Sequence, residues 1–120
     1  MFDIVLYHNK NGKSQIEDYL RKLAKATGKS ARVKNEKVHD VIQALSVYGT
    51  EGMPVHYRKY LRDKIWELRP LDDRILFAGV VGGKYVLLHQ FQKKTQKTPL
   101  DEIEKAVIEL EDYRKRSGEE

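Results

Sequence analysis

The chain has 120 residues, the length of one domain, and 40% of them are apolar, which is enough for one modest core. It has no cysteine, which excludes disulfide frameworks, thiolate nucleophiles and cysteine-based zinc sites, and it has no run of 18 apolar residues that would span a membrane. Its net charge is +5, and Asp3 interrupts the first apolar run, unlike a signal peptide, so we expect a soluble, cytoplasmic protein that does not contact membranes.

The first half of the chain is expected to form a strand and two helices. Residues 2–7 are a short β-rich run. Residues 14–17 match a capping box led by Ser14, and apolar residues follow at helical spacing until Thr27 and Gly28 break the pattern. A second helix is expected from about Ser30, with Gly49 after its end.

The second half is expected to form an antiparallel meander and a closing helix. Three β-rich runs span residues 64–69, 74–81 and 84–91. The Gly82-Gly83 pair predicts a tight hairpin, because both central positions can adopt positive φ. Thr98 is expected to cap a final helix that runs to about Arg116, with Pro99 at its first position.

The expected order is therefore β-α-α-β-β-β-α, an α+β fold in which a small, mostly antiparallel sheet packs on helices. We expect residues 1–120 to form one domain. Only residues 117–120 are typical of a frayed end.

Charge is distributed unevenly along the chain. Residues 1–100 carry 19 Lys and Arg against 10 Asp and Glu, whereas residues 101–120 carry 4 against 8. A basic body favours a polyanionic partner, since Lys and Arg bound to phosphates release counterions. Solubility alone explains a charge of this size equally well.

Alternation along the expected strands predicts an anion site. Arg69 and Arg74 both lie on the face opposite the apolar residues of their strands, so they can meet on one open face. The arginine fork binds phosphate oxygens bidentately. Surface ion pairs with Glu67, Asp72 or Asp73 are the alternative, which the sequence alone slightly favours.

Three further features supply candidates, each with a structural alternative. Residues 92–98 contain Lys93, Lys94 and Lys97 without an acid, which would hold phosphates beside a helix N-terminus or simply be solvated. His89, the only histidine within an expected strand, would transfer a proton or be a structural, hydrogen-bonded residue.

Residues 56–64 interleave aromatic and basic side chains, as where bases stack and phosphates are held, or else form a loop whose tyrosines cover the sheet edge. The candidate RNA-binding residues are Tyr57, Arg58, Arg62, Lys64 and Lys97. Other chemistries lack their motifs: the sequence contains no P-loop, no GxSxG, no HExxH and no His/Asp/Glu cluster at metal-ligand spacing. We therefore expect neither a metal nor a cofactor.

The strings at residues 66–69, 74–77 and 86–99 resemble a known pattern. They are similar to the phage-derived Gp49-like and HigB branch of the RelE/ParE toxin superfamily, in which an ELR strand, a strand with an arginine and an "LhgF.KKtqktP" segment follow one another. The KKTQKTP segment is the specific part. With the matching helix order, the resemblance covers nearly the whole chain.

The resemblance implies the toxin of a type II toxin–antitoxin pair, usually an endoribonuclease that cleaves mRNA on the ribosome without a metal. A bound antitoxin, expected to be a helix-turn-helix protein, silences it. By matching position, Arg69 and Arg74 would clamp the phosphate, Lys93 and Lys94 would supply charge or a proton, and His89 is a possible acid or base.

The resemblance does not identify the general base. Tyr113, the one tyrosine near the C-terminus, is expected on the last helix, which is the outer one, and a lysine beside other cations is an alternative. Two other functions remain open. One is a ParE-like toxin that poisons gyrase by protein contact without catalysis, and the other is an RNA-binding module that does not cleave.

Overall fold

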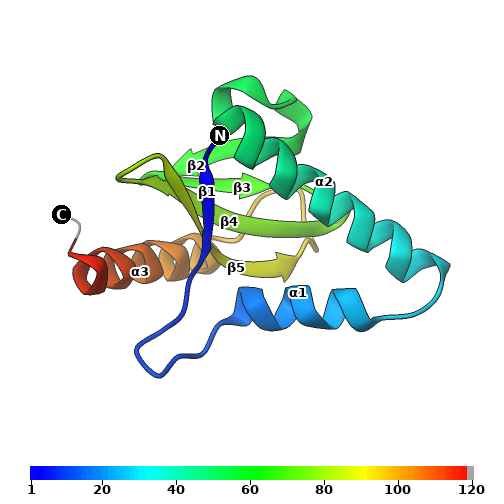
Figure 1. The fold of residues 1–120 in the computed structure, drawn as a ribbon, viewed down its shortest axis with the longest axis horizontal. Coiled ribbons are helices and arrows are strands. Elements are labelled where there is room, and N and C mark those ends of the chain that lie inside the picture. Colours follow the sequence, from blue (N-terminus) through cyan, green and yellow to red (C-terminus); the bar gives the residue numbers. More distant parts are fainter. Residues whose placement is uncertain (119–120) are drawn as a thin grey trace.

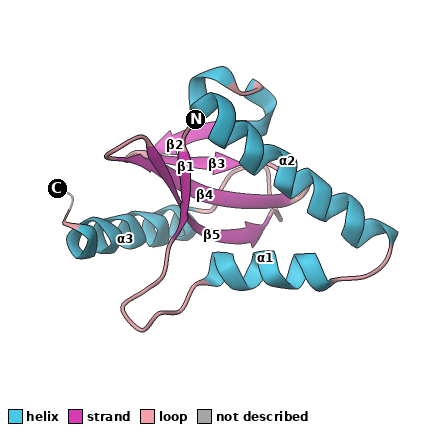
Figure 2. Ribbon diagram, in the orientation of Figure 1, coloured by secondary structure: helices cyan, strands magenta, loops and turns pink. Residues whose placement is uncertain are grey.

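The computed structural model describes residues 1–118, in which three α-helices pack on a five-stranded sheet (Figures 1 and 2). The elements are β1 (Asp3–Leu6), α1 (Gln15–Lys25), α2 (Lys29–Gly52), the 3-10 helix η1 (Val55–Tyr57), β2 (Arg58–Arg62), β3 (Ile65–Leu68), β4 (Asp73–Val80), β5 (Lys84–Gln92) and α3 (Leu100–Ser117). The strands lie in the order β1-β5-β4-β3-β2, with β1 parallel to β5 and the other pairs antiparallel. The expected α+β class and mostly antiparallel sheet are confirmed. No helix within residues 1–118 combines the length and apolarity needed to cross a bilayer.

The expected element order is wrong at one place, because the meander has a fourth strand, β2. This strand is basic on both faces, as is common at exposed sheet edges, so it lacks the alternation that marks a half-buried strand. Its turn to β3 places Asp63 and Lys64 at φ of 50° and 71°. Glycine or asparagine usually occupies hairpin positions with positive φ. Because neither residue stands here, the sequence does not predict this hairpin. Lys64, expected within a strand, lies in this turn.

The predicted helix and hairpin signals agree with the structure in most places. Ser14 caps α1, accepting a 3.1 Å hydrogen bond from the backbone of Glu17. Gly82 and Gly83 both take positive φ in the β4–β5 turn, as predicted. The helix α2 bends at Gly49, where φ is 72°, and continues for one more turn.

The predicted cap of the last helix is wrong. Pro99, rather than Thr98, occupies the N-cap position of α3, and no side chain caps the helix there. The hydroxyl of Thr98 instead donates to the buried carboxylate of Glu67. Ser117 ends α3 and Gly118 follows in the left-handed conformation, so the expectation of a frayed end is wrong for these two residues. The other two residues of that expected end, 119 and 120, lie outside the described residues.

Both faces of the sheet are covered, so the expectation of one open face is wrong. The helices α1 and α2 pack on one face against Leu68, Ile75, Phe77 and Leu87. The helix α3 packs on the other face, where Ala106 and Leu110 meet Ile65, Leu76 and Leu88. The sequence pattern misses this second core because Glu67 and Arg74 interrupt its strand residues, and both of these charged side chains are themselves buried.

A β-bulge in β5 decides where the side chains near its end point. Phe77 pairs with Leu87 and Leu76 pairs with His89, so Leu88 has no partner in the β4 register. The extra residue shifts the alternation by one position. As a result, His89 points to the α3 face together with Leu88, and strict alternation would place it on the opposite face.

Candidate functional site

The buried carboxylate of Glu67 joins the two predicted arginines. Its Oε2 lies 3.3 Å from Nε of Arg69 and 3.9 Å from Nε of Arg74. Arg69 and Arg74 flank the turn between β3 and β4, so the hairpin brings them to the same carboxylate. The side chain of Arg69 is 32% exposed, whereas Arg74 is buried. The structure therefore places the two arginines together, on a face that α3 covers in its central part.

Arg74 is held in one orientation by backbone oxygens. Its Nη1 donates to the carbonyl of Leu71 at 3.0 Å and to the carbonyl of Asp73 at 2.8 Å. Burial lowers the pKa of Arg74 from its ordinary value; Glu67 opposes this shift and the positive charge of Arg69 adds to it. Within residues 1–118, Nη2 of Arg74 has no hydrogen-bond partner, so one edge of the guanidinium remains available to an anion.

On the other face of β4, the carboxylate of Asp73 is bound by α1, α2 and β5. It accepts hydrogen bonds from the hydroxyl of Tyr19 at 2.5 Å and the amide of Gln90 at 3.1 Å, and it lies 3.4 Å from Nζ of Lys34. Burial, followed by the bond to Asp73, raises the pKa of Tyr19. Of the predicted acidic partners, only Glu67 pairs with the arginines among the described residues, and Asp73 fixes the start of β4 instead.

The lysine-rich segment after β5 is fastened at both ends. The backbone amide of Lys93 donates to the carbonyl of Asp72 at 2.7 Å, and Thr98 donates to Oε1 of Glu67 at 2.6 Å. Between these contacts Lys94 and Lys97 are exposed and Lys93 is half-buried. The segment is therefore a short loop of defined position that presents positive charge above Arg74.

Two adjacent cavities lie beside this loop. The smaller holds about 10 Å³, the size of one water molecule, and is lined by Arg74, Phe91 and residues 93–99. The larger, of about 550 Å³, is lined by Phe91, Gln92, Lys94, Thr95, Pro99 and Glu102. Arg74, Lys93, Lys94 and Lys97 thus share one cavity wall, and Arg69 joins them through Glu67. These are the predicted phosphate-binding residues, gathered at one end of the sheet.

His89 lies apart from the other predicted catalytic residues. It is 1% exposed and lines neither cavity, and its two ring nitrogens face Glu102 and Glu109 of α3. The burial and the hydrogen bonds of His89 agree with the alternative prediction, in which His89 is a structural residue. Within residues 1–118, no group of three or more histidine or acidic side chains is arranged to hold a metal ion.

The aromatic and basic residues of the β2 segment lie away from the lysine-rich loop. Two strands, β3 and β4, separate β2 from β5. Arg58 donates to the carbonyl of Thr50 at 2.6 Å and stacks over Trp66 on the α2 face, while the hydroxyl of Tyr57 accepts from Lys37. Arg62 pairs with Asp63. The structure thus separates Tyr57, Arg58, Arg62 and Lys64 from Lys97, and their role in RNA binding stays a prediction.

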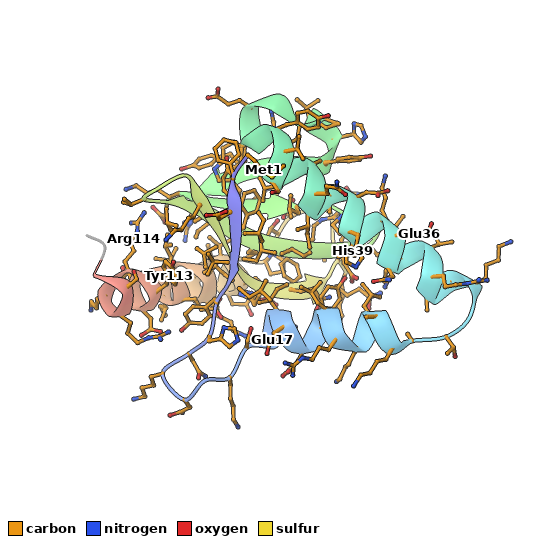
Figure 3. The ribbon with its side chains drawn as sticks, in the orientation of Figure 1. Met1, Glu17, Glu36, His39, Tyr113 and Arg114 are labelled. Carbon is orange, nitrogen blue, oxygen red and sulfur yellow. The ribbon has the colours of Figure 1, made fainter. Side chains whose placement is uncertain are left out.

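Sequence reasoning missed Glu67, Thr98 and Glu102 as parts of this site. The sequence predicts Glu67 only as a surface partner of the arginines, because a glutamate between the apolar residues of a strand indicates a solvent-facing position. Tyr113 lies near the C-terminal end of α3 (Figure 3), where it packs beside the core, and it lines neither cavity. The only available signal for Glu102 was its spacing of seven residues from Glu109, which places both on one helix face.

Residues 18–111 match the sequence model of a family described as "Phage derived protein Gp49-like (DUF891)". The match begins within α1 and ends within α3, so it includes all residues that line the two cavities. No curated protein matches the chain.

Proposed function

The chain belongs to the Gp49-like family of phage-derived proteins, within the RelE/ParE-like toxin superfamily, and on that premise we propose that it is a toxin that cleaves mRNA. The reaction needs no metal, since Arg and Lys supply the positive charge. Its substrate is mRNA on the ribosome, and it acts in the cytoplasm. A cognate antitoxin, a helix-turn-helix protein, would silence it.

The single observation that carries this proposal is the concentration of cations at one end of the sheet. Arg69, Arg74, Lys93, Lys94 and Lys97 converge there, and among the described residues that line the small cavity none is acidic. Such a surface is suited to a phosphodiester, whose transition state carries more negative charge than its ground state. Because backbone carbonyls and Glu67 fix Arg74 beforehand, little reorganisation is needed when that charge develops.

In the proposed reaction, the ribose 2′-hydroxyl attacks the adjacent phosphate and the 5′-oxygen leaves. Arg74 binds a phosphate oxygen through its available edge, and Arg69 adds charge from the solvent side. Lys94, which is exposed on the wall shared by both cavities, donates a proton to the departing 5′-oxygen. Phe91 lines both cavities and offers an aromatic surface against which a base can stack.

The antitoxin would act on the same surface. An acidic or amphipathic segment is complementary to the lysine-rich loop, and attraction between opposite charges would speed its capture.

The test is to map the 5′ ends of cellular mRNA after expression of the wild-type chain, Arg74→Ala, Lys94→Ala and a matched control, Lys115→Ala. Lys115 is an exposed lysine at the far end of α3. The proposal expects cuts within translated codons for the wild type and control, and few for Arg74→Ala and Lys94→Ala. Undiminished cutting by both variants would overturn this site. DNA damage without cuts would indicate gyrase poisoning, and RNA binding without cuts a non-cleaving module; either outcome would overturn the proposed function.

A further inference from the structure

The buried imidazole of His89 lies between two carboxylates, one of which lines the larger cavity, and no step of the proposed cleavage uses it. Nε2 of His89 lies 2.9 Å from Oε1 of Glu102, and Nδ1 lies 2.5 Å from Oε1 of Glu109. His89 comes from β5, and both glutamates come from α3. The bulge at Leu88 turns the ring towards α3, and the seven-residue spacing of the glutamates places them two helical turns apart on the same face.

The two glutamates have different surroundings. Glu102 lines the 550 Å³ cavity and its side chain is 28% exposed. Glu109 is 13% exposed and lies at the edge of a separate cavity with Lys13 and Lys105, which neither the loop nor Arg74 lines. Within residues 1–118, Oε2 of Glu102 has no hydrogen-bond partner. Glu102 is therefore the member of the cluster that a substrate can reach.

The cavity of Glu102 adjoins the cavity of Arg74. Phe91, Lys94, Thr95 and Pro99 line both. A phosphate held by Arg74 and Lys94 would place its neighbouring ribose in the larger cavity, on the side of Glu102. In this arrangement, cations would lie beside the phosphate and the partly exposed carboxylate of Glu102 would lie beside the ribose.

We propose that Glu102 is the general base that takes the proton of the ribose 2′-hydroxyl, with His89 and Glu109 as the residues that position it. The inference rests on the proposed ribonuclease function and names the base that sequence reasoning leaves unidentified. His89 fixes one carboxylate oxygen, which leaves the other free to accept the proton, and Glu109 holds the ring from behind.

The step balances without a co-reactant. Oε2 of Glu102 accepts the hydroxyl proton while the 2′-oxygen bonds to phosphorus and the bond from phosphorus to the 5′-oxygen breaks. Lys94 gives a proton to the departing 5′-oxygen. The products are a 2′,3′-cyclic phosphate and a 5′-hydroxyl, and the proton on Glu102 returns to the lysine through solvent.

The competing explanation is that the His89 cluster only fastens α3 to the sheet. The general-base role and the purely structural role predict different effects of the Glu102→Gln substitution. Glutamine retains a hydrogen bond to His89, so a fastening role is largely preserved, whereas it cannot accept a proton as a carboxylate does. The matched control is Glu104→Gln, which removes the same charge from an exposed position of the same helix.

The experiment uses the purified full-length chain. Single-turnover cleavage of a labelled mRNA in a ribosome complex gives the rate constant, and a fluorescein-labelled RNA 12-mer gives the affinity. Glu102→Gln is expected to lower the rate constant by about 10²- to 10⁴-fold while the affinity changes by less than about twofold. Glu104→Gln should change neither by more than about twofold. Glu102→Asp, which keeps a carboxylate, should retain more activity than Glu102→Gln.

The positioning residue needs its own readout. Glu109→Gln is expected to lower kcat without raising KM, whereas a purely structural role would lower the thermal midpoint and leave the rate constant of the folded protein unchanged. If the wild type cuts and Glu102→Gln cuts as fast as Glu104→Gln, the inference is overturned and the ribonuclease function stands. If the wild type leaves mRNA intact, the proposed function fails and the inference fails with it.

Discussion

The hydroxyl of Thr98 donates a 2.6 Å hydrogen bond to the carboxylate of Glu67, which is 2% exposed, and so joins the lysine-rich loop to strand β3. The same carboxylate holds Arg69 and Arg74. One buried group therefore sets the distance between the loop lysines and the two arginines.

Replacing Thr98 by valine should weaken this junction. Valine keeps the shape of threonine but leaves Oε1 of Glu67 without its donor, so we expect the free energy of unfolding to fall by about 1–3 kcal/mol. The measurement is urea-induced unfolding. In the matched control, Thr95→Val, the lost bond joins the exposed Thr95 hydroxyl to the carbonyl of Lys97, and the expected change is within about 0.5 kcal/mol. Equal changes in the free energy of unfolding for the two substitutions would show that the Thr98 hydrogen bond does not stabilise the position of the loop.

The two arginines should differ in how well lysine replaces them. Arg74 is buried and its guanidinium donates to two carbonyls that a lysine cannot reach with the same geometry, so Arg74→Lys is expected to lower the cleavage rate about 10²- to 10³-fold. Arg69 is about a third exposed with one acidic partner, so Arg69→Lys should cost less than about tenfold. Single-turnover cleavage assays compare them, and a larger loss for Arg69→Lys would contradict the assignment.

Two glycines with positive φ, Gly49 and Gly83, have very different surroundings. A Cβ on Gly49 would lie 2.8 Å from Cε2 of Phe2 and 3.1 Å from the hydroxyl of Tyr85, whereas a Cβ on Gly83 would meet nothing within 4 Å. Gly83→Ala should therefore cost only the backbone term, about 1–2 kcal/mol. Gly49→Ala adds the clash and should cost at least about 1 kcal/mol more. Thermal unfolding monitored by circular dichroism measures both, and equal losses would contradict the kink geometry.

Stability at alkaline pH should depend on Tyr7, whose hydroxyl donates to Asp112 at 2.6 Å. Burial, with added effects of Asp112, raises the pKa of Tyr7 from 10.0 to about 12. Because the folded pKa is above the unfolded value, the contribution is complete below pH 10 and is lost as the pH rises towards 12. The difference in unfolding free energy between wild type and Tyr7→Phe should be constant from pH 7 to 9 and then shrink. A difference that stays constant to pH 12 would contradict this.

The sequence predicts those parts of the fold whose signals are local. Ser14 at the start of α1 and the Gly82-Gly83 turn each mark an element through their own side chain or backbone freedom. The adjacency of Arg69 and Arg74 follows from strand alternation, because the β3–β4 register is regular up to the Leu68–Ile75 pair and Arg69 and Arg74 come directly beyond it.

Other parts depend on contacts that no local pattern records. The edge strand β2 is specified by pairing with β3, not by its own alternation. The direction of His89 depends on one unpaired residue, Leu88, in a register that only the folded sheet has. The burial of Glu67 depends on α3 covering its face, and α3 begins some 30 residues later in the chain. The sequence therefore predicts the arginines and lysines of the site, but it does not predict the places of Glu67 and Glu102.

The chemistry of the cut RNA ends tests the central claim most directly. A labelled mRNA in a ribosome complex would be incubated with the purified chain, and the end groups of the fragments would be identified by phosphatase and kinase treatment and mass spectrometry. Attack by the 2′-hydroxyl at a site of Arg and Lys side chains predicts 2′,3′-cyclic phosphate and 5′-hydroxyl ends that are lost in Arg74→Ala. Fragments with 3′-hydroxyl and 5′-phosphate ends, or cutting that persists unchanged in Arg74→Ala, would contradict the account.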